Sequence, residues 1–240
     1  MNMQKLSQSF LSLLAVPLLG GLALLPIAPV VGVTFQPKGS PDQTAGGASR
    51  GLCSATGVAS LGGGPKGAIA ALIPATDGEL TAAAYPTVLV KVPTSESVQA
   101  EFVLWDENAN AVYQTTVTLN NTPGIFSFKV PSSVQPMAIG KQYKWNVAIV
   151  CDPANRQRDM VVGGSLQRAS LSPILSSQLE SADGLQKAKL YAQNGFWYDT
   201  VATLAELKRS RPSDPSIAAE WGQLLESVGL AELSHTPLVN

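Results

Sequence analysis

The sequence predicts a mainly β protein with an α-helical C-terminal part. Between residues 68 and 168, seven short segments are rich in β-branched and aromatic residues, alternate in polarity and are separated by turn sequences. From residue 172 onward, apolar residues recur at helical spacing instead. We therefore expect a seven-stranded antiparallel sandwich of immunoglobulin-like type, followed by a helical hairpin. A closed barrel is the competing arrangement of the strands.

The strands are expected over residues 68–73, 87–92, 98–106, 111–119, 125–130, 142–151 and 159–168. In the third segment, Ala100, Phe102 and Leu104 fall on one face, which predicts a side that faces the core. Gly163 and Gly164 interrupt the last segment, and two adjacent glycines in a strand predict a bulge.

Helices are expected over about 173–182, 183–193, 196–209 and 214–228. The first and the last begin with a capping residue followed by proline, in Ser172-Pro173 and Asp214-Pro215. The second and third resemble a single tetratricopeptide repeat, with a small residue, aromatic residues and an inter-helix glycine at the positions that the repeat requires. Thr200 departs from that pattern, because the repeat has a small residue there.

The N-terminal segment is typical of a secretory signal peptide. Lys5 gives a short positive region, and residues 10–25 are apolar apart from Ser12. Residues 1–33 are therefore a leader, cleaved between about Ala28 and Thr34, or else an uncleaved anchor. The predicted parts that follow are a flexible linker at 34–50, a β-sandwich domain at 51–170, a helical subdomain at 171–232 and a tail at 233–240. The protein is expected to be exported, to the periplasm, the envelope or the cell exterior.

The chain has two cysteines, Cys53 and Cys151, which lie at the two ends of the strand-rich region. In an exported protein such a pair is expected to form one structural disulfide. That bond would remove both thiols from the set of potential nucleophiles.

The composition excludes several kinds of partner. Only 14% of the residues are charged, the net charge is −1, and the two signs are mixed along the chain. A nucleic-acid interface needs clustered Lys and Arg, so none is expected. Contact with a membrane is expected only through the N-terminal segment, if it stays uncleaved.

Residues that carry chemistry are scarce, so we expect no catalytic, cofactor-binding or metal-binding residues and no enzymatic activity. The single histidine, His235, lies in a polar tail without an orienting partner. The glycine-rich stretch at 61–67 lacks the order of a phosphate-binding loop. The acidic residues Glu101, Asp106 and Glu107 are interpreted as solvated charges on the strands and turns.

Two surfaces are candidates for binding a partner. Arg156, Arg158 and Asp159 surround the turn after Cys151, and function concentrates on such loops. Phe196, Trp197 and Tyr198 are consecutive and cannot all face one core from one helix. They are interpreted either as packing between the two parts of the protein or as an exposed surface for a partner.

The order of motifs resembles a cyanobacterial family catalogued as domain of unknown function 928. The resemblance rests on the segments RGLC at 50–53, YPTVLVKVP at 85–93, EFVLWDE at 101–107, GKQYKWNVAIVCDP at 140–153, LQRASLSP at 166–173 and YAQNGFWYDTVATLAEL at 191–207. It covers residues 50–233 and implies an exported protein with a leader. It implies no activity and no catalytic residues.

Together these observations predict an exported, non-enzymatic binding or adaptor module that recognises a protein of the cell envelope. One alternative is a hydrolase of envelope glycans or peptides that uses acidic residues the sequence does not single out. Another is a structural subunit of a secretion or surface assembly.

Overall fold

The structure, a computed structural model, describes residues 32–38, 68–75, 78–95, 97, 99–119 and 122–239. Backbone contacts divide the chain into residues 1–30 and residues 31–240. All described residues belong to the second unit. No helix in these residues has both the length and the apolar character needed to cross a membrane.

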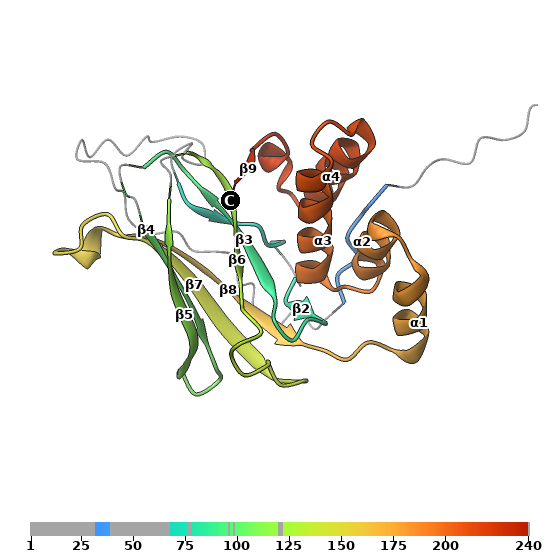
Figure 1. Cartoon of the computed structure of the whole chain (residues 1–240), viewed down its shortest axis with the longest axis horizontal. Coiled ribbons are helices and arrows are strands. Elements are labelled where there is room, and N and C mark those ends of the chain that lie inside the picture. The colour runs from blue at the N-terminus through green and yellow to red at the C-terminus, as the bar shows by residue number, and fades with distance from the viewer. Residues whose placement is uncertain are drawn as a thin grey trace, which may run out of the picture. The chain divides into compact units, whose positions relative to one another are not determined.

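The strands form two sheets, which can be followed in Figure 1. The five-stranded sheet has the order β2 (Leu80–Thr81), β8 (Met160–Arg168), β7 (Gln142–Ile149), β4 (Gln99–Trp105) and β5 (Ala111–Thr118). The four-stranded sheet has the order β1 (Ala70–Ala71), β3 (Thr87–Val92), β6 (Gly124–Lys129) and β9 (Leu238–Val239).

A strand is present in each of the seven predicted segments, but the expectation of a purely antiparallel, seven-stranded fold is wrong. Two further strands, β2 and β9, pair parallel with β8 and β6 and make both sheets mixed. Each is two residues long. Such a short segment has no measurable alternation, and its pairing depends on a strand distant in the sequence.

The two sheets face each other across a common core and form a β-sandwich. Ala100, Phe102 and Leu104 of β4 are fully buried, as their alternation predicts. The ring of Phe102 stacks on that of Phe128 in β6, with the ring centroids 5.7 Å apart. Since Phe128 belongs to the opposite sheet, this contact joins the two layers.

Gly163 and Gly164 do not form the predicted bulge. The pairing of β7 with β8 runs through both glycines without a shift, whereas the β4–β5 pairing shifts between Leu104 and Trp105. A Cβ at Gly163 would lie 2.7 Å from the carbonyl oxygen of Trp145, and one at Gly164 would lie 3.0 Å from its indole ring. The glycines therefore allow Trp145 to lie close against β8.

The helices are α1 (Pro173–Ser181), α2 (Gly184–Gln193), α3 (Trp197–Ser210) and α4 (Pro215–Ser227), with the short 3-10 helices η1 (Arg156–Arg158) and η2 (Ala231–Leu233). Ser172, Asp183 and Asp214 cap α1, α2 and α4, and each side chain accepts a hydrogen bond from the first turn. Gly195 has a φ of 80° in the turn between α2 and α3, where a residue with a Cβ would be strained. The tetratricopeptide resemblance of α2 and α3 stays a prediction.

The sheets and most helices share one hydrophobic core. Buried residues of α2, α3 and α4, among them Ala188, Trp197 and Trp221, belong to the same cluster as the buried residues of both sheets. The residues of α1 join a smaller cluster with Leu190 and Phe196. The predicted boundary between strands and helices lies between the end of β8 and the start of α1, but the core is continuous across it.

Residues 32–38 form an extended segment against the helices, so the flexible linker predicted from residue 34 is wrong for its first residues. The backbone amide of Phe35 donates to Ser227 Oγ at 3.2 Å, and that of Gln36 donates to the carbonyl oxygen of Ala192 at 3.1 Å. The Phe35 ring meets Trp197 edge-on, with the centroids 5.1 Å apart. Residues 39–50 and all but the last two residues of the predicted leader lie outside the described residues.

Candidate functional site

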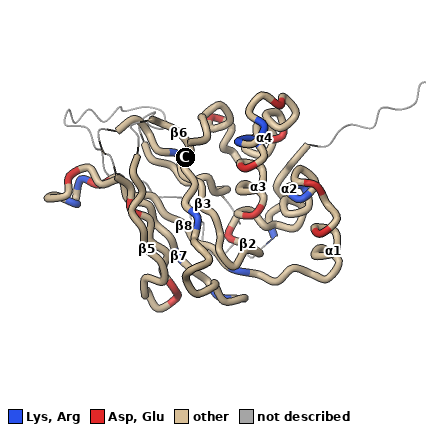
Figure 2. The backbone as a smooth tube through the Cα atoms, viewed as in Figure 1, with Lys and Arg blue, Asp and Glu red and all other residues tan. Residues whose placement is uncertain are grey.

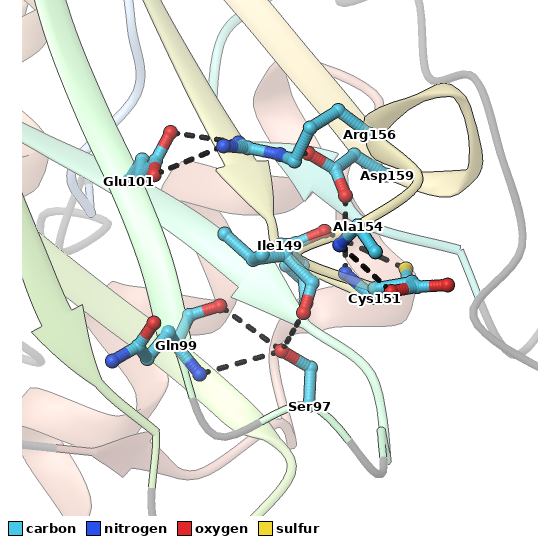
Figure 3. Close-up of polar contacts among 10 residues, drawn as sticks. Ser97, Gln99, Glu101, Ile149, Cys151, Ala154, Arg156 and Asp159 are labelled. Atoms are coloured by element: carbon cyan, nitrogen blue, oxygen red, sulfur yellow. Dashed lines mark hydrogen bonds and ion pairs between the residues drawn. The ribbon is translucent and has the colours of Figure 1, made fainter.

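The turn between β7 and β8, residues 150–159, is held by the carboxylate of Asp159, which the sequence placed in this turn beside Arg156 and Arg158. Asp159 is only 5% exposed. Its Oδ1 accepts the backbone N–H of Cys151 at 3.1 Å, and its Oδ2 accepts Nε of Arg156 at 2.6 Å (Figure 3). The side chain therefore ties the start of the turn to η1.

Arg156 connects the same turn to the sheet. Its two terminal nitrogens donate to the two carboxylate oxygens of Glu101 in β4, at 3.2 and 2.7 Å. These hydrogen bonds, together with that from Nε to Asp159, raise the pKa of the guanidinium above its ordinary value. A planar guanidinium that binds two carboxylates in this way has little rotational freedom. Glu101 is thus not the free solvated charge that the sequence indicated.

The base of the turn is fixed from the side of the β4 strand. Ser97 Oγ donates to the carbonyl oxygen of Val150 at 2.6 Å, and the backbone N–H of Val150 donates to the carbonyl oxygen of Gln99 at 3.0 Å. These hydrogen bonds continue the contact between β4 and β7 beyond the last regular pair of that pairing, Ala100 with Ile149. The turn therefore begins from a fixed position, and Figure 3 shows the hydrogen bonds of Ser97 at this point.

Residues 153–158 of the turn, which we call the hairpin tip, are all exposed. Figure 1 shows this tip projecting away from the sheets, and Figure 2 shows positive charge on it with acidic residues at its base. Among the described residues, no ion pair involves Arg158. The structure thus distinguishes the two predicted arginines, because Arg156 binds Glu101 and Asp159, whereas none of the ion pairs among the described residues involves Arg158.

The aromatic residues Phe196, Trp197 and Tyr198 do not form an exposed surface, and that interpretation is wrong. They are 6%, 0% and 2% exposed. Trp197 Nε1 donates to the carbonyl oxygen of Leu72 at 2.8 Å, and the Tyr198 hydroxyl donates to that of Ser165 at 2.7 Å. These residues instead pack between the helices and the sheets, as the other of the two interpretations predicted.

The reason for this burial is the position of α3. This helix contacts α2 and α4 as well as strands β2 and β3. A helix with packed neighbours on several sides can bury consecutive aromatic residues, whereas a surface helix buries only one face.

Asp199 is a further polar residue where α3 packs against the sheets. Its Oδ2 accepts the backbone N–H of Ala82 at 2.9 Å. Burial raises the pKa of its carboxyl group to about 6. The sequence gave no signal for it, because the amide that it binds belongs to a segment more than a hundred residues away.

Glu220 in α4 is a second buried acid, 7% exposed. Its Oε1 is 3.0 Å from Nζ of Lys189 in α2, and its Oε2 accepts the backbone N–H of Val33. A signal for this residue existed, because Glu220 lies at helical spacing between Ile217 and Leu224, on the apolar face of its helix. A charged residue on such a face indicates a buried partner.

A pocket of about 330 Å³ lies near the C-terminal end of the described chain. Among the residues that line it are Lys91 of β3, Glu232 of η2 and His235. The three offer an ammonium, a carboxylate and an imidazole, which can hydrogen-bond a small polar molecule. His235 was expected to be an uninvolved tail residue. Within the described residues, no group of three or more His, Cys, Asp and Glu side chains is placed to hold a metal ion.

The predicted disulfide is only partly within the described residues. Cys151 follows the end of β7, partly buried beside the core, and it is not a free thiol. Cys53 lies outside the described residues. The pairing of the two cysteines therefore stays a prediction.

Comparison with known proteins gives a family. Residues 45–238 match the model of the Domain of Unknown Function DUF928. The chain belongs to the DUF928 family. The match takes in β1 to β8 and helices α1 to α4 of the described residues, and it begins after the extended segment 32–38.

No curated protein matches this DUF928 chain. Among solved structures, it is similar to the fn3 domain of the human collagen alpha-1(XX) chain, a solution structure, with 13% identity over 48% of this chain and 92% of that domain. The TM-score of this match is 0.28.

Proposed function

We propose that this DUF928 protein is an exported, non-enzymatic binding or adaptor module of the cell envelope. In this proposal the β-sandwich is the scaffold, and the hairpin tip at 153–158 is the element that contacts a protein partner. The signal-like N-terminal segment supports export. The observation that supports a recognition role is the set of bonds by which Arg156 holds the turn to Glu101 and Asp159.

These bonds favour binding because they fix the tip before a partner arrives. Ordering a loop on association costs free energy, and a loop that is already ordered avoids that cost. Both members of each ion pair that holds the tip belong to this chain, so the pairs need not be broken when a partner binds. Exposed loops on a rigid β scaffold are the places where binding residues concentrate.

The chemistry of the tip indicates an acidic contact on the partner. Arg158 is exposed next to the fixed Arg156, and arginine is enriched among residues that dominate binding energies. Its guanidinium is suited to a carboxylate on the partner, which it can bind with two parallel hydrogen bonds.

Crosslinking and affinity purification of the tagged protein from its native envelope test the proposal. The Arg158→Ala variant is expected to lose a specific partner that the wild-type protein retains. Arg156→Ala is expected to weaken the same interaction by releasing the tip. Lys144→Ala is the matched control, because Lys144 is an exposed cation on β7 away from the tip.

An identical set of partners for Arg158→Ala and Lys144→Ala would contradict a role for the tip. Turnover of envelope glycans or peptides by the purified wild-type protein would favour the hydrolase instead. A stable complex that survives both substitutions would favour a structural subunit.

A further inference from the structure

The four edges of the two sheets differ in how much backbone they leave open to pairing. Three of the edges are the short strands β1, β2 and β9, each two residues long. The fourth is β5, with eight residues. Proteins commonly keep edge strands short, because an open row of N–H and C=O groups can pair with another chain. Three edges follow this rule, and β5 does not.

The sequence of β5 also lacks the charges and prolines that discourage edge pairing. Ala111–Thr118 reads AVYQTTVT and contains no charged residue and no proline. Charged side chains and proline are the usual means of preventing strand addition. Figure 2 shows the strand without charge along its length. In the part of the chain that the structure describes, no strand pairs with β5 on the side away from β4.

One irregularity limits the part of β5 that can accept a partner. The pairing with β4 shifts at Leu104 and Trp105, so that Tyr113 lies opposite Leu104 and Ala111 lies opposite Trp105. Val112 is the extra residue and is 41% exposed. A bulge bends a strand and increases its twist. The regular stretch for pairing is therefore Tyr113–Thr118.

We propose that β5 pairs antiparallel with β5 of a second copy of this chain, about a two-fold axis at Thr115. In this register Tyr113 lies opposite Val117 of the second copy, Gln114 lies opposite Thr116, and Thr115 lies opposite itself. The five-stranded sheets of the two copies then become one continuous sheet, independently of the hairpin tip.

Charge and shape favour a second copy as the occupant. A two-fold axis places the same strand on both sides of the contact, so an edge strand that carried charges of one sign would repel its second copy. The uncharged β5 has no such penalty. Pairs of an aromatic with a β-branched residue, such as Tyr113 with Val117, stabilise antiparallel neighbours. The two-fold axis forms each such pair twice, once on each side of Thr115. In a closed two-fold contact, both copies use the same surface.

Sedimentation velocity of the purified protein over a wide concentration range measures this association. A single pair of short strands buries little surface, so the dimer is expected to be weak and to appear only as the concentration rises. Backbone amides of β5 should become protected from hydrogen exchange over the same range. Amides of β7, which has a neighbour on each side, should not change.

Charge variants identify both the partner and the register. Gln114→Lys combined with Thr116→Lys places like charges opposite each other twice, and should weaken the dimer by about 2- to 30-fold. Gln114→Glu combined with Thr116→Glu should do the same. An equimolar mixture of these two double variants should associate again. Gln114→Lys combined with Thr116→Glu puts opposite charges face to face at a Thr115 axis, and should strengthen the dimer.

Gln142→Lys is the matched control, because it adds the same charge at an exposed position of β7, an inner strand. It should leave association unchanged. A monomer at all concentrations, with no change in exchange of β5, would overturn the proposal. So would association that the double variants leave intact, or a mixture of oppositely charged variants that stays monomeric. A heterologous peptide strand would be the occupant if β5 gained protection only on adding another protein.

Discussion

Replacing Tyr198 by phenylalanine tests whether the helices and the sheets form one cooperative structure. The hydroxyl of Tyr198 in α3 accepts a hydrogen bond from Trp145 Nε1 of β7 at 2.9 Å. It donates one to the carbonyl oxygen of Ser165 in β8 at 2.7 Å. Both aromatic side chains are 2% exposed, so water cannot replace the lost oxygen without rearrangement.

The expected loss follows from these two bonds. Removing the acceptor leaves the buried Trp145 N–H unsatisfied, which costs about 1–3 kcal/mol. Losing the donor to Ser165 adds about 0.5–1.5 kcal/mol. The free energy of unfolding should fall by about 2–4 kcal/mol, and the Tm should fall by about 4–16 °C for a protein of this size.

Urea and thermal unfolding, followed by far-UV and near-UV circular dichroism, measure the change. Both signals should move together in a single transition, because α3 shares the core of the sheets. Tyr143→Phe is the control, since the Tyr143 hydroxyl accepts an exposed amide, that of Ala138, at 2.9 Å. Its cost should stay below about 1 kcal/mol. Equal losses in the two variants, or separate transitions for helices and sheets, would refute the argument.

Three further outcomes are expected. Because burial raises the pKa of Asp199 to about 6, the folded state takes up a proton more readily than the unfolded state, and its stability should fall as the pH rises from 4 to 7. Urea titrations across this range should show a fall of at most about 3 kcal/mol in the wild-type protein, and none from this group in Asp199→Asn. Gly163→Ala should lower the Tm, since its Cβ would lie 2.7 Å from the carbonyl oxygen of Trp145, whereas Gly222→Ala, with nothing within 4 Å, should raise stability by about 0.5–1 kcal/mol; the opposite order would contradict the packing. Peptide mapping without reductant should yield one fragment that joins Cys53 to Cys151, and reduction should cost at most about 4–5 kcal/mol; two free thiols would disprove the disulfide.

Local patterns predicted much of the fold. The alternation of Ala100, Phe102 and Leu104 identified a core face, and the capping sequences at Ser172 and Asp214 placed helix starts at the observed residues. These features depend on neighbours in the sequence, which share one strand or one helical turn. The short strand β9 could not be found in this way, because its register depends on β6.

The candidate site was predicted only in its position. The turn after Cys151 was identified with Arg156, Arg158 and Asp159, but Arg156 also binds Glu101, a residue on another strand. For the aromatic residues at the start of α3, the sequence left packing and an exposed surface as alternatives for a related reason. A helical pattern shows that Trp197 and Tyr198 point in different directions, but not that both directions are occupied.

The sequence by itself determined the seven predicted strand segments, the helices with their caps and the turn that bears Arg156 and Arg158, because those depend on residues a few positions apart. The tertiary structure decided which polar groups meet and which surfaces remain open. It joined Asp199 to Ala82, placed residues 32–38 on the helices and left β5 as the long edge of a sheet. These contacts form when distant segments share one core, and the burial that brings them together depends on the whole chain rather than on any local pattern.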